Sequence, residues 1–175
     1  MKKAIIILFI SVIGFFSLLF VPSQPALVFE YENTGQLVAY LKMDKGSTFQ
    51  VKYTHSIHLS DVIETYEVSD TGQLKQKQLE YEDFAIGMPS DAEGNEKFIE
   101  KNGHYMITNM NRTFDYIDLR IGQVVANHTL IHERRKIPFS SFMKEGTWVR
   151  IDYRLISLWD VLKGVNVLGQ RSDEI

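Results

Sequence analysis

Chemically reactive side chains occur on two neighbouring predicted strands of this sequence. Residues 48–55 and 62–69 alternate apolar and polar side chains, a period of two that is typical of strands with one buried face. On that face the first strand carries His55 and the second carries Glu64, among aliphatic and aromatic residues. Neither side chain is stable alone in an apolar environment, so we expect the two to lie opposite each other and share a hydrogen bond.

A single antiparallel register supports this pairing. It aligns three pairs on the apolar face, namely Val51 with Val68, Tyr53 with Tyr66, and His55 with Glu64. Directly opposed residues have Cβ atoms about 5 Å apart, so the paired side chains would touch. The register therefore predicts a cluster of one imidazole, one carboxylate and two phenols.

The sequence is compatible with three uses of this cluster. It can be a structural polar pair that fixes the register. It can be a binding site for a small-molecule ligand, for which we select His55, Ser56, Glu64, Tyr53 and Tyr66. It can also be catalytic, with His55 as base, Glu64 as its orienting partner and Ser56 as nucleophile, although strand alternation points this serine to the opposite face. A metal site would need a third ligand such as His58, whose position nothing fixes, so we predict no metal and no other cofactor.

The first 21 residues differ in composition from the rest of the chain. Lys2 and Lys3 precede an uncharged, mostly apolar run over residues 4–21. A helix of that run would be about 27 Å long, near the thickness of a hydrocarbon core. The lysines favour an N-terminus inside the cell and a translocated domain. We predict that residues 1–21 are a single-pass membrane anchor that contacts lipid through residues 4–21; the alternative is a cleaved signal peptide, after which the domain would be secreted.

The remainder predicts a linker over residues 22–26 and one all-β domain over residues 27–175. Short alternating segments are separated by turns rich in Gly, Asn and Asp, which favours an antiparallel β-sandwich or a partly open barrel. Residues 90–103 are polar and predict a long loop. Ser157 and Asp160 have the spacing of a capping box and predict one short helix over residues 158–163. The expected strands cover residues 27–33, 36–43, 48–55, 62–69, 74–86, 104–110, 113–121, 127–132 and 148–155.

Composition excludes several classes of function. The net charge is -3, and the one basic run, residues 134–136, is short, so we expect no nucleic-acid surface. The chain contains no cysteine, which excludes disulfides, thiolate metal ligands and a lipidated N-terminal cysteine.

Three motifs stand out in the middle of the chain: Tyr53-Thr54-His55-Ser56-Ile57, Glu64-Thr65-Tyr66-Glu67-Val68, and residues 84–89 with their Gly-x-Pro element. Together they resemble the bacterial family named domain of unknown function 1850, and the resemblance covers most of the chain beyond residue 26. Family members often have a more glycine-rich run where this chain has Ala85-Ile86-Gly87.

The resemblance implies a small bacterial protein with an N-terminal membrane segment, of a kind often associated with TRAP transporters of the TAXI type. These tripartite systems import organic solutes such as carboxylates or amino acids. We therefore expect an extracytoplasmic accessory protein that assists uptake or binding of a small organic solute, with a TRAP-type permease or solute-binding subunit as its partner. His55, Ser56 and Glu64 carry over as signature residues without an assigned role. The resemblance does not imply an enzyme; the alternatives are a small exported hydrolase and a purely structural envelope protein.

Overall fold

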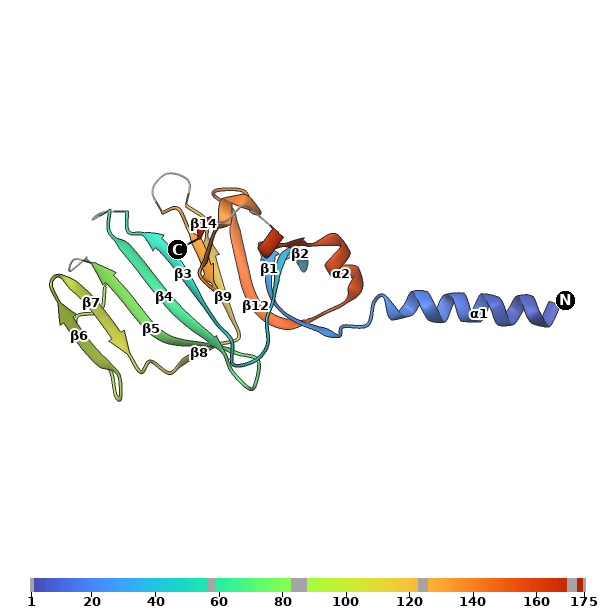
Figure 1. Ribbon diagram of the computed structural model, residues 1–175, viewed down its shortest axis with the longest axis horizontal. Helices are drawn as coiled ribbons and strands as arrows, with labels where there is room; N and C mark the ends of the chain where they lie inside the picture. Colours follow the sequence, from blue (N-terminus) through green and yellow to red (C-terminus); the bar gives the residue numbers. More distant parts are fainter. Residues whose placement is uncertain (1, 57–58, 83–87, 123–125, 170–172, 175) are drawn as a thin grey trace.

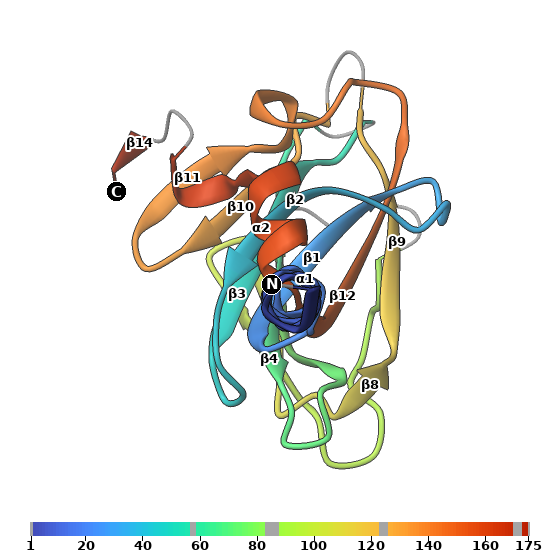
Figure 2. The ribbon, with the colours of Figure 1, turned by 90° about the vertical axis from the view of Figure 1, so that its right-hand side faces the viewer.

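The computed structural model describes residues 2–56, 59–82, 88–122, 126–169 and 173–174. One long helix, α1 (Lys2–Leu18), extends away from a domain built mainly of strands (Figure 1). A short helix, α2 (Leu158–Lys163), lies on the domain close to the end of α1, as the view along α1 also shows (Figure 2). The mostly β architecture confirms the all-β part of the predicted fold class.

The strand that follows α1 in the sequence belongs to a five-stranded sheet, here called the small sheet. Its strand order is β13-β2-β1-β12-β9, and every pair is antiparallel except β13 with β2. The central pairing joins distant parts of the chain, since Gln24 lies opposite Ile156. The strands are β1 (Gln24–Tyr31), β2 (Gln36–Lys42), β9 (Tyr116–Arg120), β12 (Trp148–Ile156) and β13 (Val165–Asn166).

A nine-stranded sheet, here called the large sheet, lies across from the small sheet (Figure 1). Its strand order is β14-β11-β10-β3-β4-β5-β7-β6, and β8 pairs with β5 beside this path. The strands are β3 (Thr48–Thr54), β4 (Asp61–Val68), β5 (Leu74–Glu82), β6 (Lys97–Lys101), β7 (His104–Thr108), β8 (Arg112–Phe114), β10 (Thr129–His132), β11 (Arg135–Pro138) and β14 (Asp173–Glu174).

The main hydrophobic core contains residues from both sheets. Leu27, Phe29 and Ile151 come from the small sheet, and Val51 and Val68 come from the large sheet. A single-turn helix η1 (Phe139–Ser141) adds Phe139, whose ring centroid lies 5.7 Å from that of Phe29. Burial of this apolar surface is the main force that holds the sheets together. A second cluster lies toward the β5–β7 side of the large sheet and comprises Val62, Leu79, Tyr81, Ile107 and Met110.

Helix α2 is fixed by the local signals that the sequence contains. The Ser157 hydroxyl accepts a hydrogen bond from the Asp160 backbone N–H, and the Asp160 carboxylate accepts one from the Ser157 N–H. Val161 packs on a third cluster of Ala26, Val28, Tyr40 and Ile156, on the outer face of the small sheet. The predicted helix and its capping box are confirmed with the same bounds. A second single-turn helix, η2 (Val167–Gly169), follows β13.

Several predicted boundaries are wrong. The polar segment 90–103, expected as a loop, contains β6, which pairs with β7 as a hairpin. Residues 113–121, expected as one strand, form β8 and β9 in different sheets. Strand β1 begins at Gln24, inside the expected linker over residues 22–26, because Gln24 and Pro25 already pair with β12.

The apolar N-terminal run forms α1, which has 17 residues. Within the part of the chain that the structure describes, no helix has both the length and the apolar character needed to cross a membrane.

Candidate functional site

Strands β3 and β4 pair as expected, but in a different register. Glu64 lies opposite Val51, and Tyr66 lies opposite Phe49. The predicted alignment of His55 with Glu64 is therefore wrong, by four residues along β4. The hairpin closes earlier than expected because the His55 N–H donates to the Ser60 oxygen at 2.8 Å. An even-numbered shift leaves every side chain on its predicted face, so the polar residues still lie on the apolar side of the sheet.

Glu64 and Tyr66 form the centre of the site. The Tyr66 hydroxyl donates to Glu64 Oε2 at 2.7 Å. On the inner face, Glu64 lies between Val51 of the main core and Leu79 of the second cluster. Burial raises the pKa of the Glu64 carboxyl above its ordinary value, and the Tyr66 hydrogen bond opposes that rise. The structure thus places a carboxyl group at the boundary between two apolar clusters.

Tyr53 extends this polar group toward the hairpin end of β3. Burial and the nearby charge of Glu64 raise the pKa of the Tyr53 phenol to about 12. The pKa of Tyr66 is raised by burial, by the charge of Glu64 and by its hydrogen bond to Glu64. Tyr53 and Glu64 are half-buried, so part of each side chain contacts solvent. Two phenols and one carboxyl group therefore line one stretch of the inner face and can bind a polar group of a ligand.

His128 belongs to the same neighbourhood, although the sequence analysis did not select it. Its ring stacks on Tyr53 with centroids 5.4 Å apart. His128 Nδ1 accepts a hydrogen bond from the Gly122 N–H at 3.2 Å, which leaves the ring hydrogen on Nε2. Burial lowers the pKa of this imidazole, so the neutral form is favoured. Strand alternation could have indicated this position. His128 lies two residues before Leu130 and therefore on the same face, and Leu130 pairs with Val51 on the inner face of the large sheet. We call Tyr53, Glu64, Tyr66 and His128 the inner polar cluster.

His55 and Ser56 lie at the hairpin turn, apart from Glu64. His55 follows the end of β3 and is half-buried, and Ser56 is exposed. Along β3, His55 lies four residues beyond Val51, the residue opposite Glu64. At roughly 3.3 Å per residue this separation is about 13 Å. His58, the suggested third metal ligand, lies outside the described residues. In the parts of the chain that the structure describes, no three side chains of metal-ligand type gather to hold an ion.

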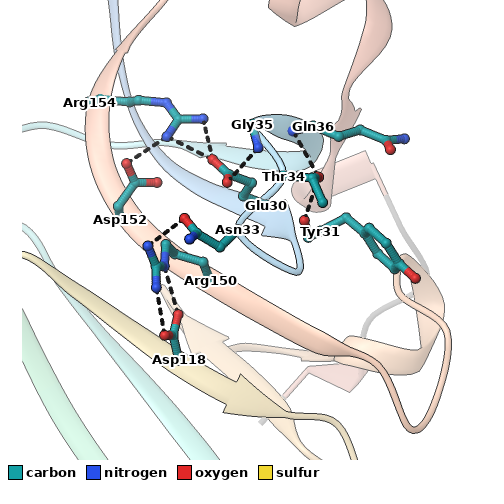
Figure 3. Close-up of polar contacts among 10 residues, drawn as sticks. All are labelled: Glu30, Tyr31, Asn33, Thr34, Gly35, Gln36, Asp118, Arg150, Asp152 and Arg154. Atoms are coloured by element: carbon teal, nitrogen blue, oxygen red, sulfur yellow. Dashed lines mark hydrogen bonds and ion pairs between the residues drawn. The ribbon is translucent and has the colours of Figure 1, made fainter.

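A second polar network covers the outer face of the small sheet (Figure 3). Arg150 forms two hydrogen bonds with the Asp118 carboxylate, at 2.8 and 2.7 Å, and these lower the pKa of Asp118. Arg154 contacts Glu30 at 3.2 Å and Asp152 at 2.7 Å. These contacts join β1, β9 and β12.

The same network also fixes the hairpin between β1 and β2. The buried Glu30 carboxylate accepts from the Gly35 N–H at 2.8 Å, and Asn33 accepts from Arg150. Every carboxylate in Figure 3 is thus held by an arginine from β12. We interpret the network as a cross-strand support and place the candidate site at the inner polar cluster.

The model of the family described as Domain of unknown function (DUF1850) matches residues 49–139. The chain belongs to this family. The DUF1850 range contains the whole inner polar cluster, β3 except Thr48, and the strands from β4 to β11, whereas α1, β1, β2, β12 and α2 lie outside it. Comparison with curated proteins and with solved structures gave no match.

Proposed function

We propose that this protein is a membrane-attached, extracytoplasmic accessory component of a solute transporter and that its inner polar cluster binds a small organic solute. The observation that carries solute binding is the Glu64–Tyr66 pair, a half-buried carboxyl group and its phenol donor between two apolar clusters. Binding sites for small molecules commonly combine apolar walls with a few convergent polar groups. Replacing buried charged groups by apolar residues often leaves a fold equally stable or makes it more stable, so fold stability alone does not account for a carboxyl group at this position.

Attachment to a membrane is supported by α1. No charged residue follows Lys3 in this helix, and its described apolar side chains, including Ile5, Phe9 and Phe16, are exposed. An exposed apolar surface of this extent is unusual in a soluble monomer and is typical of contact with lipid or protein. The two N-terminal lysines favour translocation of the domain.

The transporter partner is proposed from the family resemblance, which points to TAXI-type TRAP systems and hence to a permease or a solute-binding subunit. We favour a binding role over hydrolysis, because Ser56 is exposed at the hairpin turn and Glu64 bonds to Tyr66.

The test is uptake of labelled solute by a strain that depends on the transporter. Deletion of the gene should lower uptake, and the wild-type gene should restore it, whereas Glu64→Ala should not. Thr65→Ala, on the opposite face of β4, is the matched control and should restore uptake. Unchanged uptake after deletion would refute the accessory role. Full rescue by Glu64→Ala would show that the accessory role does not depend on the inner polar cluster.

A further inference from the structure

The end of α1 is fixed to the domain rather than joined to it by a free linker. The backbone N–H of Trp159 donates to the Leu19 carbonyl oxygen at 2.9 Å, and the backbone N–H of Ser23 donates to the Ile156 carbonyl oxygen at 3.0 Å. The rings of Phe20 and Trp159 are in contact, with centroids 5.4 Å apart. The direction in which the apolar helix leaves the domain is therefore determined by contacts with the N-terminal part of α2.

Helix α2 directs its large apolar side chains in two directions. Val161 faces the third core cluster. Leu158 and Leu162 are four residues apart, lie on one side of the helix, and are 43% and 72% exposed. An unpaired apolar side of this kind is costly in water and marks a contact surface.

The remaining residues of this surface have the chemistry of a membrane interface. Trp159 is partly exposed, and Lys163 Nζ lies 4.6 Å from the centre of its ring. Tryptophan favours the headgroup level of bilayers because its ring is apolar and its N–H is polar. Lysine can rest its aliphatic part on such a ring while its ammonium group reaches lipid phosphates.

We propose that this surface, which we call the α2 surface and which comprises Phe20, Leu158, Trp159, Leu162 and Lys163, lies against the lipid bilayer. The occupant is lipid because the α2 surface is continuous with the exposed apolar residues at the end of α1, through the Phe20–Trp159 contact. The proposal rests on the proposed membrane attachment and adds an orientation to it: the α2 end of the domain faces the membrane, and the β6 edge points away.

The two tryptophans of the chain provide the test. Trp148 lies at the start of β12, about 26 Å from Ile156 at roughly 3.3 Å per residue, and is exposed. Trp148→Phe leaves Trp159 as the reporter of the α2 surface, and Trp159→Phe leaves Trp148 as a matched reporter of the far end. Each full-length variant would be reconstituted into phosphatidylcholine–phosphatidylglycerol vesicles, with and without brominated acyl chains, and its flotation with the vesicles and its fluorescence recorded.

We expect both variants to float with the vesicles and brominated lipid to quench Trp159, whose indole would lie near the headgroup–acyl boundary, while Trp148 is unaffected. L158S/L162S in the Trp148→Phe background should reduce that quenching without loss of flotation. Ile99→Ser, an exposed apolar position on β6, should leave it unchanged.

The outcomes separate this orientation from membrane attachment itself. Flotation without quenching of Trp159, or equal quenching of both tryptophans, would overturn the orientation and leave attachment standing. Failure of the full-length chain to float would overturn both.

Discussion

At the scale of single residues, Glu64 should give the protein a pH-dependent stability. Burial raises its pKa in the folded state, so its favourable contribution is present below the ordinary value of 4.5 and is lost as pH rises through the raised pKa. Glutamine at this position keeps an acceptor for the Tyr66 hydroxyl but does not ionise. We predict that the Tm of Glu64→Gln rises relative to the Tm of the wild type when the pH is raised from about 4 to about 7.5.

Circular dichroism melts of the full-length protein in mild detergent would measure this difference. Thr65→Ala, which removes the bond from Gln50 and no ionisable group, should shift Tm equally at both pH values. A Glu64→Gln difference that is the same at both pH values would contradict the buried carboxyl group.

Tyr53 is a second residue with a measurable signature. Its phenol has a pKa of about 12 in the folded protein because of burial and the Glu64 charge, so the stability associated with it is present below pH 10.0 and is lost as pH rises through about 12. Tyrosine absorbance should therefore lose a late step, near pH 12, when Tyr53→Phe is compared with the wild type. Loss of a step near pH 10 instead would place this side chain in solvent.

At the scale of elements, α2 depends on a close approach behind its C-terminal end. A Cβ at Gly164 would meet the Leu37 side chain and lie 3.0 Å from the Asp160 oxygen. We predict that Gly164→Ala lowers the free energy of unfolding by about 1–3 kcal/mol through overpacking. Gly169→Ala, where an added Cβ meets nothing within 4 Å, is the control and should change it by less than about 0.5 kcal/mol. Urea unfolding would compare the two, and equal effects would refute the packing argument.

The elements also show what sequence can and cannot predict. Helix α2 was predictable residue for residue because its cap and its stop are local. The alternation in β3 and β4 correctly placed Tyr53, Glu64 and Tyr66 on the inner face. It could not fix the register, because any shift by an even number of residues preserves the faces. The hairpin bond between His55 and Ser60 decides the register, and the approach of His128 to Tyr53 depends on strands far apart in sequence.

At the scale of the whole molecule, the main core should make the two sheets unfold together. Phe29 is fully buried and contacts both Phe139 and Phe142. We predict that Phe29→Ala lowers the free energy of unfolding by about 3–5 kcal/mol and that strand signal and tryptophan fluorescence are lost in one transition.

The exposed Ile99 offers the matched control, since Ile99→Ala should change the free energy of unfolding by less than about 0.5 kcal/mol. Two separate transitions in Phe29→Ala would mean that the sheets are independent units.

The pairing of β1 with β12 has a consequence for how the chain folds during synthesis. Contacts between residues so distant in sequence make folding slow, because a long loop must close before they form. Strand β1 leaves the ribosome early but has only β2 beside it until residues 148–156 have been synthesised. The large sheet, whose strands from β3 to β8 pair within a shorter stretch, can form first and provide the apolar surface on which the small sheet closes. A chain that stops before Trp148 would leave β1 as an open apolar edge, and we expect cellular proteases to remove it.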